Sequence, residues 1–310
     1  MIRYDKVILL YNAIRYPTMI IQCNMMRHDK RGPEHRLFPF LLDLGRPEAV
    51  LNHTCNFYLD SEEGVSVGVW HTLPASQWDE AAGRSPEWYR ETLGDGRPVI
   101  IYLHGNLGTR WDESGRIGTL EFAAGYHVLS LDYRGFGDST GEPSEDGLTI
   151  DALFLYHWVK KQSRGPVCLW GHSLGSAVDA LILEAAFTTI GEVVVNYPLT
   201  KVGGYISVCL QPLGVFMKTE ENLFFFTAIA NVCGKRALTC PLLILHAEDD
   251  DIVPYHMGQK ISLQAKKESN TDVRVEMISY SATLGFSHNN IYLDPNLSNV
   301  VGKFLQNLRQ

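Results

Sequence analysis

The sequence predicts an α/β protein whose central sheet is mostly parallel and is covered by helices on both faces. Continuous apolar runs, such as 98–103 and 241–245, are typical of parallel strands that are buried on both sides. Segments with helical spacing of apolar residues alternate with these runs, which is the pattern of an α/β sheet. The length of 310 residues, 45% of them hydrophobic, fits one large domain of this class with excursions.

From residue 57 onward the spacing of apolar residues becomes regular enough to assign individual strands and helices. We expect strands at 65–70, 98–103, 127–131, 167–170, 241–245 and 273–279. We expect helices near 117–124 and at 149–161, 258–267 and 299–308. Residues 1–55 have no clear period and contain four prolines, so we expect an irregular N-terminal arm followed by one domain over 56–310.

A segment of about 191–240 breaks this rhythm and contains three consecutive phenylalanines at 224–226. A lid-like insertion above the sheet, with an apolar lining, would explain these aromatic residues. A core helix explains them equally well from composition alone. The position of the segment, between the Gly-His-Ser-Leu-Gly motif at 171–175 and the acidic run at 249–251, favours the lid.

The charge of the chain argues against a nucleic-acid partner, and its cysteine spacing argues against a zinc site and a disulfide framework. The 27 basic and 35 acidic residues give a net charge of −8, and no long Lys/Arg cluster occurs, so a nucleic-acid partner has no support. The six cysteines lack C-x-x-C spacing, which argues against zinc and against a dense disulfide framework. We expect no metal, and we expect free, mostly buried thiols.

No apolar run approaches the ~18 to 20 residues of a membrane span, and a secretory signal fits poorly. The apolar stretch 37–42 is too short to span, but it could dock on the domain, which is the commoner fate, or dip into a membrane surface. Asn52 and Asn296 begin N-glycosylation tripeptides, which do not fix the compartment. A soluble cytoplasmic location is one expectation for such a chain.

The pentapeptide 171–175 carries the strongest chemical signal. It reads Gly-His-Ser-Leu-Gly, a G-x-S-x-G motif, and directly follows the expected strand at 167–170. A serine on a sharp turn after a strand has the setting of a nucleophile. Ser173 is therefore the candidate nucleophile.

A serine nucleophile needs a histidine base that a carboxylate orients. In the α/β-hydrolase fold these residues follow in the order Ser, acid, His, each after a strand. Asp250 follows the strand at 241–245 and His288 follows the strand at 273–279. Three aspartates are adjacent at 249–251, so Asp249 is the alternative acid. His104, His172 and His246 are expected to be scaffold residues.

Two backbone amides are expected to form the oxyanion hole. Leu174 N–H immediately follows the nucleophile, and the Gly-rich bend 104–108 follows the strand at 98–103. Asn106 is our choice for the second donor, with Leu107 as the alternative. Glycines 135, 137 and 141 miss the dinucleotide-binding spacing by one residue, so we expect no nucleotide and no other cofactor.

Together these motifs resemble the α/β-hydrolase domain-containing protein 12 family, and are nearest to its B-type branch. The likeness covers roughly residues 56–309 and is carried by five segments: 68–72, 102–106, 132–135, 170–175 and 241–250. Members are membrane-associated serine lipases of the endoplasmic reticulum that act on lysophospholipids, notably lysophosphatidylserine, and on monoacylglycerols. The resemblance implies Ser173, Asp250 and His288 as the triad.

The sequence departs from that family after the nucleophile, where members have a full helix before the next strand. Here only 176–178 separate the motif from 179–183, which reads like a strand, although a parallel crossover normally takes a dozen or more residues. Either 179–183 stays in the sheet, or 176–190 becomes the helix and 193–195 fills the strand position. Good helix propensity favours the second interpretation.

The leading functional interpretation is a lipase-type serine hydrolase that cleaves the ester of a lysophospholipid or monoacylglycerol, with a membrane surface as a further partner. The alternative is a catalytically impaired isoform that binds lipid or protein. Both interpretations share the α/β-hydrolase fold. They differ in what the missing helix does to Ser173.

Overall fold

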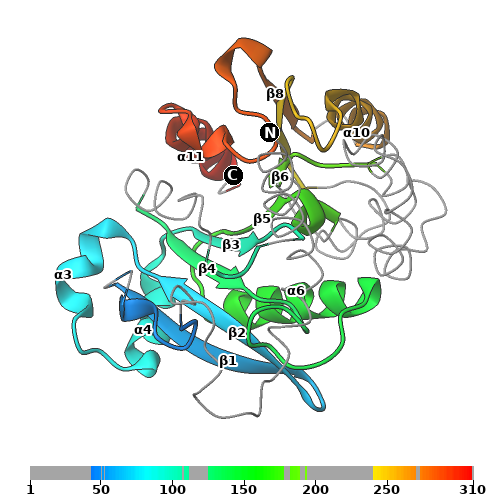
Figure 1. The fold of residues 1–310 in the computed structure, drawn as a ribbon. Helices are drawn as coiled ribbons and strands as arrows, with labels where there is room; N and C mark the ends of the chain where they lie inside the picture. The colour runs from blue at the N-terminus through cyan, green and yellow to red at the C-terminus, as the bar shows by residue number, and fades with distance from the viewer. Residues whose placement is uncertain are drawn as a thin grey trace, which may run out of the picture.

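The computed structural model describes residues 43–49, 51, 53–106, 108–111, 125–177, 182–188, 193, 240–269 and 273–308 (Figure 1). These residues form an eight-stranded sheet in the order β1-β2-β4-β3-β5-β6-β7-β8. The strands are β1 Thr54–Glu62, β2 Val65–Thr72, β3 Val99–Leu103, β4 His127–Leu131, β5 Val167–His172, β6 Ile182–Glu184, β7 Leu242–Ala247 and β8 Val275–Tyr280. β2 runs antiparallel to β1 and to β4, and every other neighbouring pair is parallel.

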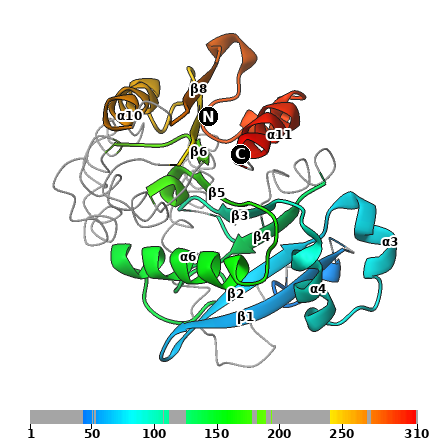
Figure 2. The same cartoon turned by 180° about the vertical axis from the view of Figure 1, so that it is seen from behind.

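Helices cover both faces of this sheet (Figures 1 and 2). α6 Glu145–Lys160 and α10 Tyr255–Glu268 contribute to the apolar cluster on one face. α11 Leu297–Asn307 contributes to the cluster on the other face. Alternating residues of the parallel strands enter the two clusters, as Ile101 and Tyr102 of β3 do, which confirms the α/β-hydrolase arrangement predicted from the apolar runs.

The remaining helices are short. They are α3 Trp78–Ala81 and α4 Pro86–Thr92, and the 3-10 helices η2 Pro47–Ala49, η3 Ala75–Gln77, η4 Leu93–Asp95, η5 Ser173–Ala177, η7 Ala282–Leu284 and η8 Ile291–Leu293. Neither α3 nor α4 was expected from the sequence. α6 begins four residues before its expected start because Ser144 caps it, with Ser144 Oγ accepting Gly147 N–H at 3.1 Å.

The favoured interpretation of the chain after the nucleophile is wrong. Residues 182–184, expected inside a helix over 176–190, form β6, which pairs in parallel with both β5 and β7. The register places Ile182 beside Trp170, near the end of β5. After the nucleophile turn the chain therefore runs back along only part of β5 before β6 begins. A three-residue strand therefore makes a short crossover feasible. Val193, expected in a strand, is helical and packs with Val253 and Met257.

Several other expectations lie outside the described residues. They are the helix near 117–124, the apolar stretch 37–42, nearly all of the arm and of the lid-like insertion, and Leu107, Asn52, Val194 and Val195. Within the described chain, no helix is long and apolar enough to cross a membrane.

The cysteines correct one expectation in part. Cys55 and Cys168 are free thiols, and Cys168 is buried, as expected. Cys240, just before β7, is disulfide-bonded, so the expectation of free thiols is wrong for Cys240.

Candidate active site

The nucleophile motif forms a tight turn at the carboxyl end of β5. Ser173 has a φ of 50°, in the left-handed region that side chains seldom adopt. A Cβ on Gly171 would lie 2.2 Å from Gly175 O, and a Cβ on Gly175 would lie 2.0 Å from Leu103 O. Both positions therefore require glycine, because the turn folds back on itself and against β3.

A 3-10 helix, η5, follows directly from this turn. Ser176 Oγ donates to Ser173 O at 2.5 Å, which closes the turn and directs the Ser176 hydroxyl back to the backbone. Leu174, the expected oxyanion donor, is buried in the same turn. Ser173 itself is half-buried. Within the described structure, its hydroxyl makes no side-chain hydrogen bond.

The structure selects Asp250 from the three adjacent aspartates as the residue that contacts His288. Asp250 Oδ1 accepts the backbone N–H of Ile252 at 3.0 Å and of Val253 at 2.7 Å, which fixes the carboxylate at the end of β7. Burial alone would raise the pKa of Asp250. Hydrogen bonds from His246 and His288, the charge of His288 and the Val253 N–H together lower that pKa well below its usual range.

His288 lies against this carboxylate in the loop after β8. Its Nδ1 is 3.0 Å from Asp250 Oδ1 and 2.9 Å from Oδ2, and the residue is buried. Because Nδ1–H donates to Asp250, Nε2 carries the lone pair that could accept a proton. Among the described residues, no hydrogen bond joins Ser173 to His288, and in unliganded hydrolases this bond is often long.

The loop that carries His288 is also joined to the nucleophile turn by a hydrogen bond between a side chain and the backbone. His172 Nε2–H donates to the carbonyl oxygen of His288 at 3.0 Å, and the two imidazole rings lie 5.0 Å apart. The sequence predicts a scaffold role for His172 but no partner for its side chain. The structure shows that His172 joins the loop that carries Ser173 to the loop that carries His288.

The expected oxyanion loop lies beside the nucleophile. A Cβ on Gly105 would lie 3.5 Å from Ser173 Cβ and 2.9 Å from His172 Nδ1, so glycine allows this close approach. The turn is closed by Gly108 N–H donating to Gly105 O at 2.9 Å. Asn106 follows Gly105 in this loop.

A buried network of charged side chains holds the chain directly after the oxyanion loop. Arg110 is fully buried, and its Nη1 donates to Asp132 Oδ2 at 2.7 Å and to Asp138 Oδ1 at 2.5 Å. Its backbone N–H donates to Asp132 Oδ1 at 2.5 Å. The guanidinium and the two carboxylates therefore fix the chain that leaves the loop.

Replacing Arg110 by methionine should lower the free energy of unfolding by about 3–5 kcal/mol, because the buried Asp132 carboxylate then lacks the guanidinium that balances its charge. Urea unfolding of both proteins measures the difference. Arg97, which pairs with Asp95 at a partly exposed site, gives a matched control: Arg97→Met should cost less than about 1 kcal/mol. Equal losses in the two variants would contradict this view of the network.

The other two scaffold histidines also make backbone contacts. His104 Nδ1–H donates to Gly105 O at 2.7 Å. His246 Nε2–H donates to Val253 O at 3.0 Å and lies 3.4 Å from Asp250 Oδ2. Both side chains therefore hold functional loops at the ends of β3 and β7, as expected for scaffold residues.

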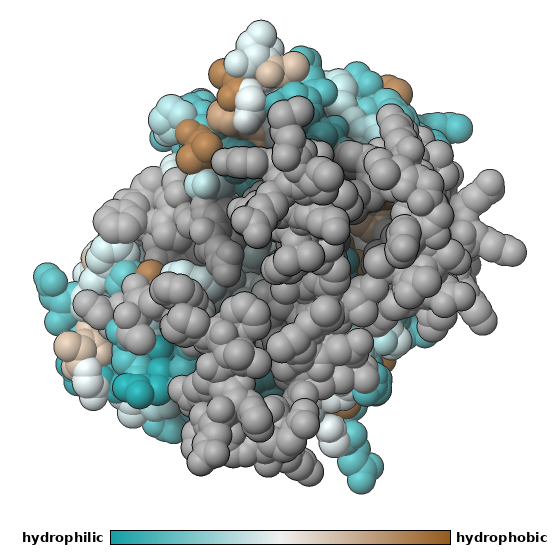
Figure 3. Space-filling model, viewed as in Figure 1, coloured by the Kyte–Doolittle hydropathy of each residue, from teal (hydrophilic) through white to brown (hydrophobic). Residues whose placement is uncertain are grey.

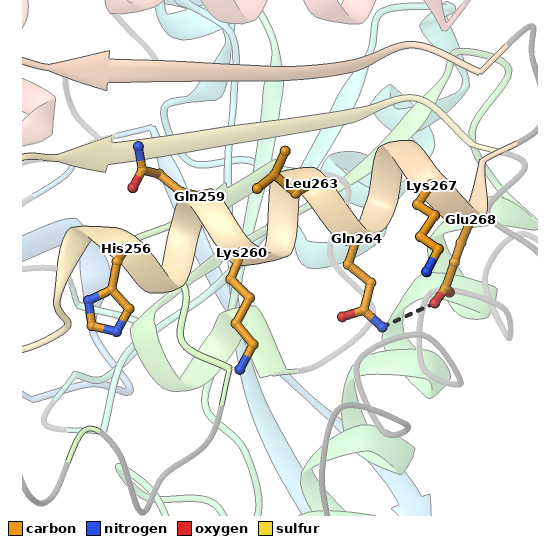
Figure 4. Close-up of a pocket in the computed structure, with 7 residues that line it drawn as sticks. All are labelled: His256, Gln259, Lys260, Leu263, Gln264, Lys267 and Glu268. Atoms are coloured by element: carbon orange, nitrogen blue, oxygen red, sulfur yellow. Dashed lines mark hydrogen bonds between the residues drawn. The ribbon is translucent and has the colours of Figure 1, made fainter.

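A hollow on the surface has none of these site residues in its described lining. It has a volume of about 520 Å³ and lies along the exposed face of α10 (Figure 4). Its described lining comes from α10 alone: His256, Gln259, Lys260, Leu263, Gln264, Lys267 and Glu268. Across the described segments, no group of three or more His, Cys, Asp or Glu side chains is arranged to hold a metal ion.

Known proteins resemble this chain over most of its length. The Alpha/beta hydrolase family matches residues 100–275. Lysophosphatidylserine lipase ABHD12 of Xenopus tropicalis is 43% identical over 296 residues, which cover 88% of this chain and 74% of that protein. Protein ABHD12B of Homo sapiens is 41% identical over 285 residues, which cover 86% and 76%.

Solved structures show the same fold at low sequence identity. Pyrococcus furiosus esterase Pf2001 superposes with a TM-score of 0.60 at 16% identity, over 83% of this chain and 91% of that one. An esterase from Pyrobaculum calidifontis superposes with a TM-score of 0.54 at 15% identity, over 84% and 85%.

Proposed function

Because the chain belongs to the α/β-hydrolase family, and within it to the α/β-hydrolase domain-containing protein 12 family, we propose that Ser173, Asp250 and His288 form its catalytic triad. The chain is a lipase-type serine hydrolase that acts on carboxylic esters. One observation carries the triad proposal: His288 Nδ1 contacts Asp250. The loop that carries His288 is in turn hydrogen-bonded to His172, the residue before Ser173.

In the proposed mechanism, His288 Nε2 takes the proton of Ser173 Oγ as that oxygen attacks the ester carbonyl. Asp250 holds the imidazole in the required tautomer and stabilises its positive charge. The amides of Leu174 and Asn106 stabilise the oxyanion, at about 2.7–4 kcal/mol per donor. The proton then passes to the leaving alcohol, and water releases the acyl group in a second round.

The substrate we propose is a single-chain acyl lipid, either a lysophospholipid or a monoacylglycerol. This proposal is supported by the relatives named lysophosphatidylserine lipase, which are 39–43% identical to this chain. Incubation of the purified chain with a fluorophosphonate probe should label Ser173, and lysophosphatidylserine should compete with the label. A label that lysophosphatidylserine and monoacylglycerol both leave unchanged would contradict this substrate class.

The short connection between β5 and β6 favours one alternative, a catalytically impaired hydrolase-like module that binds lipid or protein. Residues 173–181 make this connection, and β6 is only three residues long. The same probe separates the two functions. If the purified chain takes no label while a version with a restored crossover helix does, the catalytic function fails for this chain and the impaired module is favoured.

A membrane surface is the second partner we propose. Leu284 and Leu293 lie on either side of His288 in the chain and are 54% and 57% exposed. Described apolar side chains gather at the upper left of Figure 3, over the segment between β8 and α11. Liposome flotation tests this contact: Leu284→Ser with Leu293→Ser should reduce the bound fraction, and Leu263→Ser on α10 is the control. Equal binding by all three proteins would contradict it.

We propose the endoplasmic reticulum as the location of this membrane, with the domain on the lumenal side. The disulfide of Cys240 supports this proposal, because disulfides persist in oxidising compartments. Peptide mapping without reductant, on protein isolated from cells after blocking free thiols, measures the state of Cys240. A blocked Cys240 thiol would contradict the lumenal location.

A further inference from the structure

We propose that Asp251 and Ser287 form a positioning pair, the base latch, which holds His288 in place against Asp250. This inference rests on the proposed function, since it concerns the same base. Ser287 Oγ donates to Asp251 Oδ1 at 2.6 Å. The latch therefore lies directly beside the contact of His288 with Asp250, and two consecutive residues of one loop bind two consecutive residues of the other.

The backbone at Ser287 gives the first reason to assign it a role. Its φ is 47°, in the left-handed region, where serine is uncommon. Strained residues of this kind persist only where the surroundings hold them, and they cluster at functional sites. Ser173 is strained in the same way at 50°. The turn at Ser287 is what sends the next residue, His288, toward Asp250.

The surroundings of the base loop give the second reason. Residues 281–285 are exposed, and η7 buries none of its side chains, so apolar packing holds little of the approach to His288. Phe286 is buried against Tyr280, with ring centroids 5.4 Å apart, and anchors the chain just before the turn. Beyond that anchor, polar contacts hold the turn, among them Asn290 N–H donating to Phe286 O at 2.9 Å.

Three side chains at the carboxyl ends of β5 and β7 contact this turn. Asp250 holds the imidazole of His288, His172 holds its carbonyl oxygen, and Asp251 holds the preceding side chain. Asp250 and His172 thus hold two points of His288, its ring and its carbonyl oxygen. The latch adds a third point, on the residue directly before the base.

The latch is an exposed hydrogen bond, so its loss should alter the position of the base more than the stability of the fold. Ser287→Ala and Asp251→Ala should each lower kcat by about 10-fold, with KM within two-fold, because small misplacements of a catalytic group are costly. The double variant should fall no further than either single variant, as expected when two residues act as one unit.

Ser287→Gly separates the hydroxyl from backbone strain, since glycine adopts a φ near 47° freely. We expect this variant to be as slow as Ser287→Ala. Recovery of kcat in Ser287→Gly would overturn the latch, because strain alone would then explain the alanine variant. Ser281→Ala is the matched control: its hydroxyl caps η7 in the same loop, and kcat should stay within two-fold of wild type.

A second measurement keeps the latch testable apart from turnover. The Nδ1 proton of His288, in its hydrogen bond to Asp250, should give a low-field proton NMR signal that His288→Ala removes. We expect this signal to broaden in Ser287→Ala and in Asp251→Ala, but not in Ser281→Ala. If Ser173 proves inactive while the signal still responds to the latch, only the proposed function fails. A signal unchanged in both latch variants overturns the latch.

Discussion

Replacing Ser173 by alanine should abolish ester hydrolysis, with kcat lowered by roughly 10⁶-fold, the loss seen when a catalytic serine is removed from a comparable triad. The reason is that alanine has no oxygen to attack the carbonyl. The turn itself should survive, because Ala185 adopts a φ of 51° elsewhere in this chain, close to the 50° of Ser173. The loss would therefore report chemistry and not unfolding.

Hydrolysis of lysophosphatidylserine and fluorophosphonate labelling measure this loss together. Ser176→Ala is the informative companion, because Ser176 is the neighbouring serine and its hydroxyl already donates to Ser173 O. That variant should still take the label. A Ser173→Ala protein that retains label and turnover would show that another residue is the nucleophile.

The parallel strands of the core could be predicted from the sequence because they are buried on both faces. β3, β4 and β5 begin within one residue of their expected starts, and β7 likewise begins within one residue. β1 was missed for the opposite reason. It lies at the edge of the sheet and buries only Thr54 fully, so polar residues interrupt its pattern.

The connection after Ser173 could not be predicted because tertiary pairing opposes local propensity there. The segment has good helix-forming residues, but β6 gains backbone pairing with β5 on one side and β7 on the other. Ile182 and Leu183 are fully buried in that position. Trp170 Nε1 also donates to Glu184 Oε2 at 3.0 Å, a contact between side chains that no sequence period reveals.

The candidate site was partly predictable from chain order. The rule that acid and base follow successive strands led to Asp250 and His288, whose side chains the structure places in contact. Chain order does not separate three adjacent aspartates, because the turn decides which one faces the base. The contact of Asp251 with Ser287 was missed, since neither residue carries a motif and 36 positions separate them.

Replacing Asp250 by asparagine should lower kcat by about 10⁴-fold, the loss reported for the equivalent change in a serine protease triad, because the amide favours the wrong imidazole tautomer. Asp249→Asn is the matched control. Asp249 Oδ1 is buried without a hydrogen-bond partner in the described structure, whereas His288 Nδ1 is hydrogen-bonded to Asp250. Its turnover should stay within two-fold of wild type. A larger loss in Asp249→Asn than in Asp250→Asn would reassign the acid.

The same substitution should also change how stability depends on pH. The folded protein holds the pKa of Asp250 well below the unfolded value of about 3.9, so its carboxylate stabilises the fold above that pH. This contribution is lost as pH falls through the lower, folded pKa. An asparagine side chain does not titrate, so the difference in unfolding free energy between wild type and Asp250→Asn should be largest near neutral pH and shrink below roughly pH 4. Urea unfolding at a series of pH values measures it. A difference that stays constant from pH 7 to pH 3 would mean that the Asp250 carboxylate is not held in its charged form by His246 and His288.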